Sequence, residues 1–190
     1  MRPGLGSGSA VSGLGFGVRI VLLALALLTA PLASAALVDR VVAVVQSELV
    51  LDSEVGLEAE LAALDTSTTP FWDPDRTTPQ TRLVQSAAIR VVAEDVDLYA
   101  PPAEAVRARR EAIRRSFETR SLWLAFLKRH GLSQEGLDQV LWRRMVTERY
   151  LARNLAMPPS DPTYVPEMEA LIAAIVTRMR VRLIDPEGTP

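Results

Sequence analysis

The chain has 190 residues, about the size of one globular domain. Hydrophobic residues make up 48% and charged residues 23%, which excludes a wholly disordered or collagen-like chain. The formal net charge of -2 argues against a nucleic-acid partner. The sequence has no cysteine and a single histidine, His130, so disulfide scaffolds, thiolate zinc sites and multi-histidine metal sites are excluded. We expect no metal and no other cofactor.

Residues 1–35 have the pattern of a signal peptide. The first 38 residues carry two charges, both arginine, and an apolar run whose one polar member is Thr29 spans residues 20–30. A helix of that length covers about 16 Å, roughly half of a bilayer core. Small residues at positions 33–35 (A-S-A) follow, as signal peptidase requires. We expect cleavage before Ala36, a periplasmic location and a mature chain, residues 36–190, with no stable membrane span; an uncleaved anchor is the alternative.

The first expected element of the mature chain is a β-hairpin. Two runs rich in β-branched residues within 39–52 flank the polar step Gln46-Ser47-Glu48. Gln-Ser lacks the glycine or asparagine that a two-residue turn favours, so the turn chemistry is weak. Ser53 is expected to cap a short helix to about residue 64, and the proline-rich segment 65–78 is expected to place Phe71 and Trp72 in a surface loop.

Further helices are expected from the apolar spacing and from capping residues. They cover about residues 79–99, 102–118, 122–130, 133–155 and 166–179. Thr78 and Ser133 stand at N-cap positions, and Gly131 suits the left-handed end of a helix. Residues 181–184 (V-R-L-I) read as a last strand, which needs a partner and is expected to join the hairpin. The sequence therefore predicts a mainly helical fold with a small antiparallel sheet formed by the N-terminal hairpin and the C-terminal strand.

Two helices have unusual surfaces. The helix at 133–155 has two apolar faces at 100° per residue, with Trp142, Val146 and Tyr150 on the second face, and is expected to lie between two layers. The helix at 102–118 has a thin apolar stripe among five arginines, so most of its circumference should face solvent or a partner. This arginine-rich face is expected to be solvated; the alternative is that it attracts acidic clients or anionic lipid headgroups.

The order of these patterns resembles one family. Residues 39–45 (D-R-V-V-A-V-V), 48–51 (E-L-V-L) and 53–55 (S-E-V) resemble the opening of the N-terminal domain of the SurA-like periplasmic chaperones. Residues 126–141 look like the helix-Gly-Leu-Ser-helix step of that family, and the closing helix and strand are similar to its C-terminal element. The resemblance covers nearly all of residues 36–190 and implies a helical chaperone domain. Members often carry parvulin domains before the closing helix, but only residues 156–165 occupy that place here, so no prolyl isomerase activity is expected.

The residues offer no constellation for catalysis. His130 stands at a helix end beside Lys128 and Arg129, where a histidine most often stabilises the helix terminus. The acidic residues of segments 73–75 and 94–97 lack the alternating ligands and the glycine of a calcium loop, and no glycine pattern of a phosphate-binding loop occurs. We therefore expect a protein that is not an enzyme.

Surface binding is the function that remains. The expected activity is that of a periplasmic chaperone that binds unfolded or extended polypeptides of the cell envelope, outer-membrane proteins included, without ATP or a metal. The candidate client-binding residues are apolar or aromatic side chains: Phe71, Trp72, Trp123, Phe126, Trp142, Val146 and Tyr150. The alternative is that most of these side chains belong to the core, which applies less to Phe71 and Trp72 because of their proline-bounded loop. Arg107, Arg110 and Arg114 are the expected charged rim. The alternative is a structural or adaptor subunit that uses the same surface for one fixed envelope partner.

Overall fold

The computed structural model describes residues 39–66, 69–93 and 97–184. The signal peptide expected at residues 1–35 lies outside the described residues. In chain order the described elements are β1 (Val41–Val45), β2 (Glu48–Leu51), α2 (Asp52–Leu64), the 3-10 turn η1 (Pro70–Trp72), α3 (Pro79–Ala93), the 3-10 turn η2 (Asp97–Tyr99), α4 (Ala103–Arg115), α5 (Arg120–Arg129), α6 (Gln134–Asn154), α7 (Tyr164–Arg178) and β3 (Val181–Leu183). The predicted mainly helical fold with a small antiparallel sheet is confirmed.

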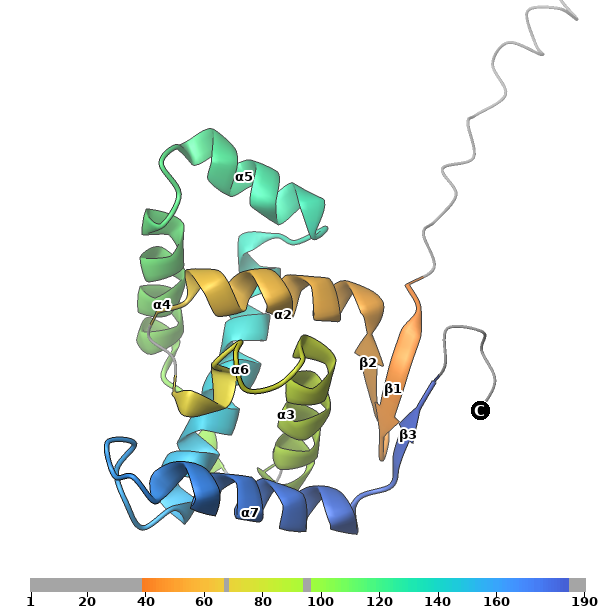
Figure 1. Ribbon diagram of the computed structural model, residues 1–190. Helices are drawn as coiled ribbons and strands as arrows, with labels where there is room; N and C mark the ends of the chain where they lie inside the picture. The colour runs from red at the N-terminus through yellow and green to blue at the C-terminus, as the bar shows by residue number, and fades with distance from the viewer. Residues whose placement is uncertain (1–38, 67–68, 94–96, 185–190) are drawn as a thin grey trace, which may run out of the picture. The chain divides into compact units, whose positions relative to one another are not determined.

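The sheet joins the two ends of the described chain. Its strand order is β2-β1-β3, with both pairings antiparallel. In Figure 1, α7 crosses below the other helices and its chain continues directly into β3, beside the hairpin. The predicted pairing of the last strand with the hairpin is therefore confirmed, and it anchors the C-terminal end of α7 to the sheet.

The hairpin turn has Gln46 and Ser47 where glycine is usual, and contacts from outside the hairpin hold Gln46 in place. Gln46 adopts φ 54°, in the left-handed region that costs a non-glycine residue about 1 to 2 kcal/mol. Its N–H donates to the carbonyl of Arg180 at 3.0 Å, and its side-chain amide contacts the sulfur of Met179 at 3.5 Å. The segment that leads into β3 thus holds the strained turn from outside the hairpin.

Three of the four predicted capping residues stand at the helix ends where they were expected. Thr78 Oγ1 accepts the N–H of Thr81 at 3.2 Å, and Ser133 Oγ accepts the N–H of Gly136 at 3.0 Å. Gly131 has φ 62°, the left-handed conformation expected after α5. The predicted cap of α2 is wrong: the helix begins one residue before Ser53, and the Ser53 hydroxyl instead bonds the Asp39 carboxylate.

The segment predicted as one helix to about residue 99 differs at its end. Helix α3 is described as Pro79–Ala93, residues 94–96 lie outside the described residues, and Asp97–Tyr99 form the 3-10 turn η2 instead of a last helical turn. Helices α4 and α5 end three and one residues before their predicted ends, within the usual variation of helix termini. These differences change no layer of the fold.

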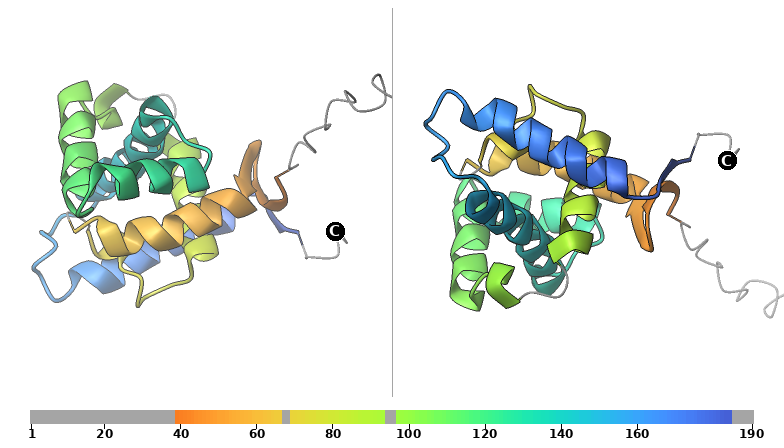
Figure 2. Two further views of the ribbon diagram at one scale, coloured as in Figure 1. Left: turned by 90° about the horizontal axis from the view of Figure 1, so that it is seen from above. Right: turned by 90° about the horizontal axis from the view of Figure 1, so that it is seen from below.

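Helix α6 joins two apolar clusters along its length. Leu137 and Leu141 in its first half pack with α2, α4 and α5, whereas Val146, Tyr150 and Leu151 in its second half pack with the sheet, α3 and α7. The sequence predicted that two opposite faces of α6 would contact two layers. The structure instead has the first half of α6 in one cluster and the second half in the other. Figure 2 shows α5 and α7 on opposite sides of the domain, which is why the two halves of α6 meet different neighbours.

Candidate functional site

Six of the seven predicted client-binding side chains are buried. Phe71 and Trp72 lie in the turn η1, not in a surface loop as predicted, and their rings meet edge to face with centroids 4.6 Å apart. Trp123 and Phe126 stack within the cluster under α5, and Val146 and Tyr150 belong to the cluster under the sheet. These large apolar side chains are packed against neighbouring helices in the interior of the domain. None of the six is more than 8% exposed.

Trp142 is the exception, with 42% of its surface exposed. It lines a shallow groove of about 580 Å³ between α4 and α6, together with Val106, Arg107 and Arg143. The guanidinium of Arg143 lies 3.0 Å from the Glu54 carboxylate, so this part of the groove is already charge-neutral.

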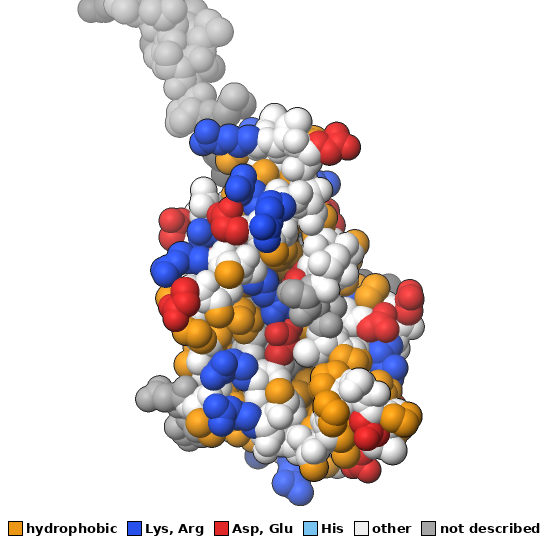
Figure 3. All heavy atoms as spheres, turned by 90° about the vertical axis from the view of Figure 1, so that its left-hand side faces the viewer, with side chains coloured by type: hydrophobic (Ala, Val, Ile, Leu, Met, Phe, Trp, Pro, Cys, Tyr) orange, Lys and Arg blue, Asp and Glu red, His pale blue; other side chains and the backbone are white. Residues whose placement is uncertain are grey.

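The three predicted rim arginines differ in their surroundings. Arg107 is exposed and has no ion-pair partner among the described residues. Arg110 is bonded to Asp138 at 2.6 Å, and Arg114 to Glu111 at 2.7 Å. On the face shown in Figure 3, Lys and Arg side chains are interspersed with Asp and Glu and do not form one continuous basic patch. The arginine-rich helix is thus largely neutralised by its own neighbours.

A buried ion network joins four helices, and sequence reasoning missed it. Glu58 of α2 pairs with Arg82 of α3 at 3.0 Å and with Arg144 of α6. Asp65, directly after α2, pairs with Arg109 of α4 at 2.6 Å. All five side chains are at most 7% exposed.

Two further contacts extend this network. Arg109 makes a two-pronged bond to Glu148 of α6, with both distances 2.7 Å. The guanidinium carbon of Arg144 lies 3.9 Å from the ring centroid of Trp72, a cation–π geometry. Three carboxylates therefore face three guanidinium groups, so the network is neutral as a whole. The uneven charge of the sequence, acidic before residue 104 and basic after it, was the available signal.

The surroundings shift two guanidinium pKa values in opposite directions. Burial lowers the pKa of Arg144, against the opposing charges of Glu58 and Asp65. Burial also acts to lower the pKa of Arg109, but its hydrogen bonds and charge contacts with Glu148 and Asp65 outweigh burial and raise the pKa above its usual value. Both guanidinium groups stay charged at neutral pH, so they act as permanent counter-charges for the carboxylates that join these helices.

A small cavity lies beside this network. It measures about 30 Å³ and is lined by Trp72, Glu58 and Arg144 among other residues. That volume suits about one water molecule and no larger ligand.

The groove between α3 and α7 is larger than the α4–α6 groove. It measures about 630 Å³, within the range of ligand sites. Its floor is apolar and is formed by Phe71, Val84, Met168, Ile172 and Val176.

The two ends of this groove differ. At one end Arg76 bonds Glu169 of α7, which places an ion pair on the rim. At the other end the groove reaches Val181 and Leu183 of the edge strand β3. The sequence placed these residues correctly on α7 and β3, but nothing in it showed that α3 and α7 leave a gap between them.

The single histidine of the sequence lies at a helix end. His130 caps α5, with its ring against Phe126 and its Nε2 3.3 Å from Glu60. Within residues 39–66, 69–93 and 97–184, no group of three or more His, Asp or Glu side chains is arranged to hold a metal ion. None of the helices in those ranges combines the length and the apolar character needed to cross a bilayer.

Comparisons with known proteins leave the chain without an assigned family. No protein-family model matches the sequence. No curated protein matches it either.

Proposed function

We propose that this protein is a SurA-like periplasmic chaperone without a parvulin domain, which binds unfolded or extended envelope polypeptides in the α3–α7 groove. The groove itself is the observation that carries the proposal. It has a volume of about 630 Å³ and an apolar floor, and it ends at the edge strand β3. Apolar contact of this kind selects for exposed hydrophobic side chains, which unfolded chains present and folded proteins bury. The proposed activity is binding, with no catalytic step and no cofactor.

The groove replaces most of the binding surface expected from the sequence. Of the predicted client-binding residues, Phe71 lines this groove. The exposed Trp142 lies in the separate α4–α6 groove. Order of elements, the closing helix and the paired last strand support the SurA-like assignment, since the resemblance rests on these features.

The experiment measures suppression of aggregation. An outer-membrane protein is diluted from denaturant with the purified protein in several-fold molar excess, and light scattering is followed. Ala173 lies exposed on α7 and lines the groove, so Ala173→Trp fills the groove from its wall. Ala174 is also exposed but is absent from the groove lining, so Ala174→Trp is the matched control.

The proposal requires suppression by the parent chain and by Ala174→Trp, and loss of most of it in Ala173→Trp. No suppression by the parent chain would overturn it. Equal suppression by both variants would move the client site away from this groove. Pull-down from envelope extracts separates the chaperone from an adaptor: many unrelated clients support the chaperone, and one stoichiometric partner supports the adaptor.

A further inference from the structure

Within the described residues, the outer edge of β3 has backbone groups without a hydrogen-bond partner. The carbonyl of Arg180 accepts the N–H of Gln46, and the N–H of Ile184 donates to the carbonyl of Val42, both at 3.0 Å. In an antiparallel pair, alternate residues direct their N–H and C=O groups to the same neighbour. The backbone groups of Val181 and Leu183 therefore point away from β1, and β3 is the last strand of the described sheet.

The two faces of this edge have different chemistry. Val181 and Leu183 line the α3–α7 groove, and Leu183 is 60% exposed. Successive side chains of a strand point to opposite faces, so Arg182, which pairs with Val44, projects from the other face.

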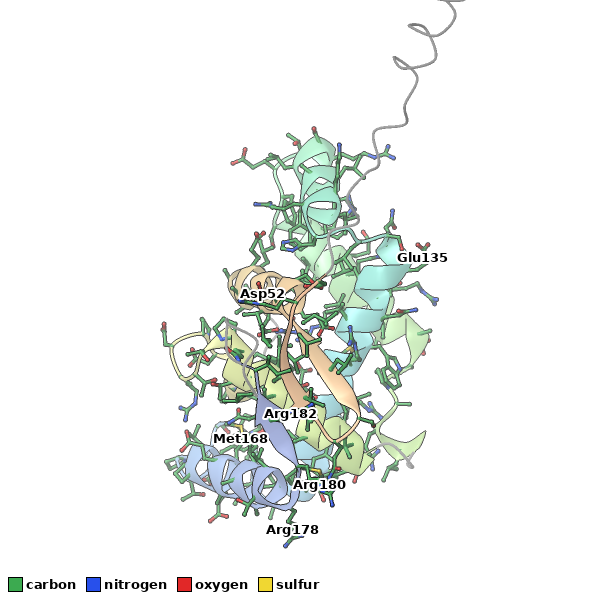
Figure 4. All side chains as sticks on the ribbon, turned by 90° about the vertical axis from the view of Figure 1, so that its right-hand side faces the viewer. Asp52, Glu135, Met168, Arg178, Arg180 and Arg182 are labelled. Atoms are coloured by element: carbon green, nitrogen blue, oxygen red, sulfur yellow. The ribbon has the colours of Figure 1, made fainter. Side chains whose placement is uncertain are left out.

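Three arginines lie along this edge without ionic partners. Arg178, Arg180 and Arg182 are exposed, and among the residues that the structure describes none of them forms an ion pair. Figure 4 shows them following one another from the end of α7 into β3. Most other arginines of the domain are paired with carboxylates, so this row is a local excess of positive charge.

We propose that an extended polypeptide segment with the pattern apolar–acidic–apolar adds to the free edge of β3 as a fourth, antiparallel strand. The proposal deepens the proposed function and rests on it, since the added strand is the client. Its apolar side chains stand opposite Val181 and Leu183 and enter the groove, and its acidic side chain stands opposite Arg182. The last pair is of the non-hydrogen-bonded type, in which side chains lie closest.

The charge row argues against a second copy of this chain as the occupant. Two β3 strands paired about a two-fold axis through their centres place Arg182 opposite Arg182. Like charges directly opposite one another destabilise a strand pair, and charged residues on edge strands are a common protection against self-association. The same arginines attract an acidic strand. The edge therefore disfavours pairing with a second copy of β3 and favours pairing with an acidic client.

The experiment uses a fluorescent peptide that contains Val-Glu-Val-Glu-Val, and fluorescence anisotropy measures its binding to the purified protein. In one probe the valine amides that face β3 are N-methylated, and in its control the glutamate amides that face away are methylated instead. A third probe replaces glutamate by lysine. We expect methylation of the valine amides and the exchange for lysine each to weaken binding by about tenfold or more, and methylation of the glutamate amides to change it little.

Protein variants test the same edge. Leu183→Pro removes the outward N–H and leaves the β1 ladder intact, because that N–H takes no part in it. Leu183→Ala shortens the side chain and keeps the N–H. We therefore expect Leu183→Pro to weaken binding more than Leu183→Ala does. Arg182→Glu should reverse the preference between the glutamate and lysine peptides. Circular dichroism of each variant identifies any that fails to fold, and for such a variant the methylated probes on the parent chain decide.

The outcomes separate the two proposals. Binding that Ala173→Trp abolishes, but that is indifferent to methylation, to charge exchange and to Leu183→Pro, would overturn strand addition and leave the chaperone groove standing. Absence of binding for every peptide, together with no suppression of aggregation, would overturn both proposals. Dimerisation of the parent chain at the concentrations used, lost in Leu183→Pro, would assign the edge to a second copy and also overturn strand addition.

Discussion

Arg82 donates from its Nε to a carboxylate oxygen of Glu58 at 3.0 Å, and the two side chains are 1% and 2% exposed. Arg144 bonds the second oxygen of the same carboxylate. One carboxylate thus joins α2, α3 and α6 at the point where the two apolar clusters meet.

Replacement of Glu58 should destabilise the fold severely. Glu58→Gln leaves two buried guanidinium groups without their shared counter-charge, and loss of one partner of a buried pair costs about 3 to 5 kcal/mol. Urea unfolding followed by circular dichroism measures the loss. Asp52→Asn is the control, because Asp52 pairs with Arg40 at 3.3 Å on the surface and about half of each side chain is exposed. That control should cost about 1 kcal/mol or less; equal costs would contradict the importance of the network.

The domain should lose stability in alkaline solution through Tyr164. Burial raises the pKa of Tyr164 above its usual value of 10.0, and the charge of Glu148 raises it further. In the unfolded chain the phenol ionises near its ordinary pKa, so above that pH the folded state binds more protons and stability falls as pH rises. The stabilisation is complete below about pH 10 and is lost as pH rises through the folded-state pKa. Tyr164→Phe should flatten the dependence of the urea midpoint on pH above 10, and an unchanged slope would contradict the assignment.

The three tryptophans should differ in quenching. Trp72 and Trp123 are at most 3% exposed, whereas Trp142 is 42% exposed. Iodide should therefore quench one component of the native fluorescence and leave the rest almost unchanged. Trp142→Phe should remove the quenchable component. Residual quenching of similar size in this variant would show that Trp72 or Trp123 is open to solvent.

The hairpin turn should accept glycine with a gain in stability. Gln46→Gly removes the penalty of a positive φ and should stabilise the domain by about 1 kcal/mol, less the greater backbone entropy of glycine in the unfolded chain. Ser47→Gly brings only the entropic cost, because Ser47 is not among the described residues with positive φ. Thermal unfolding of both variants measures the difference, and a lower midpoint for Gln46→Gly than for Ser47→Gly would show that the Met179 contact outweighs the strain.

Local patterns in the sequence were enough to predict most elements and their joining. Thr78, Ser133 and Gly131 act at the helix ends where they were expected, because capping depends on hydrogen bonds that span only a few residues. The pairing of the last strand with the hairpin also followed from sequence, since a strand of three or four residues is unstable alone.

The candidate site needed the tertiary structure. Nothing within residues 65–78 shows that Trp72 is covered by Arg144, which lies seventy-two positions away in the sequence and reaches the ring only because the fold brings α6 next to η1. The partner of Arg109 is likewise decided by which helices face one another, so a helix that reads as a solvated basic surface contributes to the interior instead. Composition and periodicity determined which segments become helices and strands; the packing of those segments alone decided which aromatic side chains are buried, which charges neutralise one another and where a groove remains open.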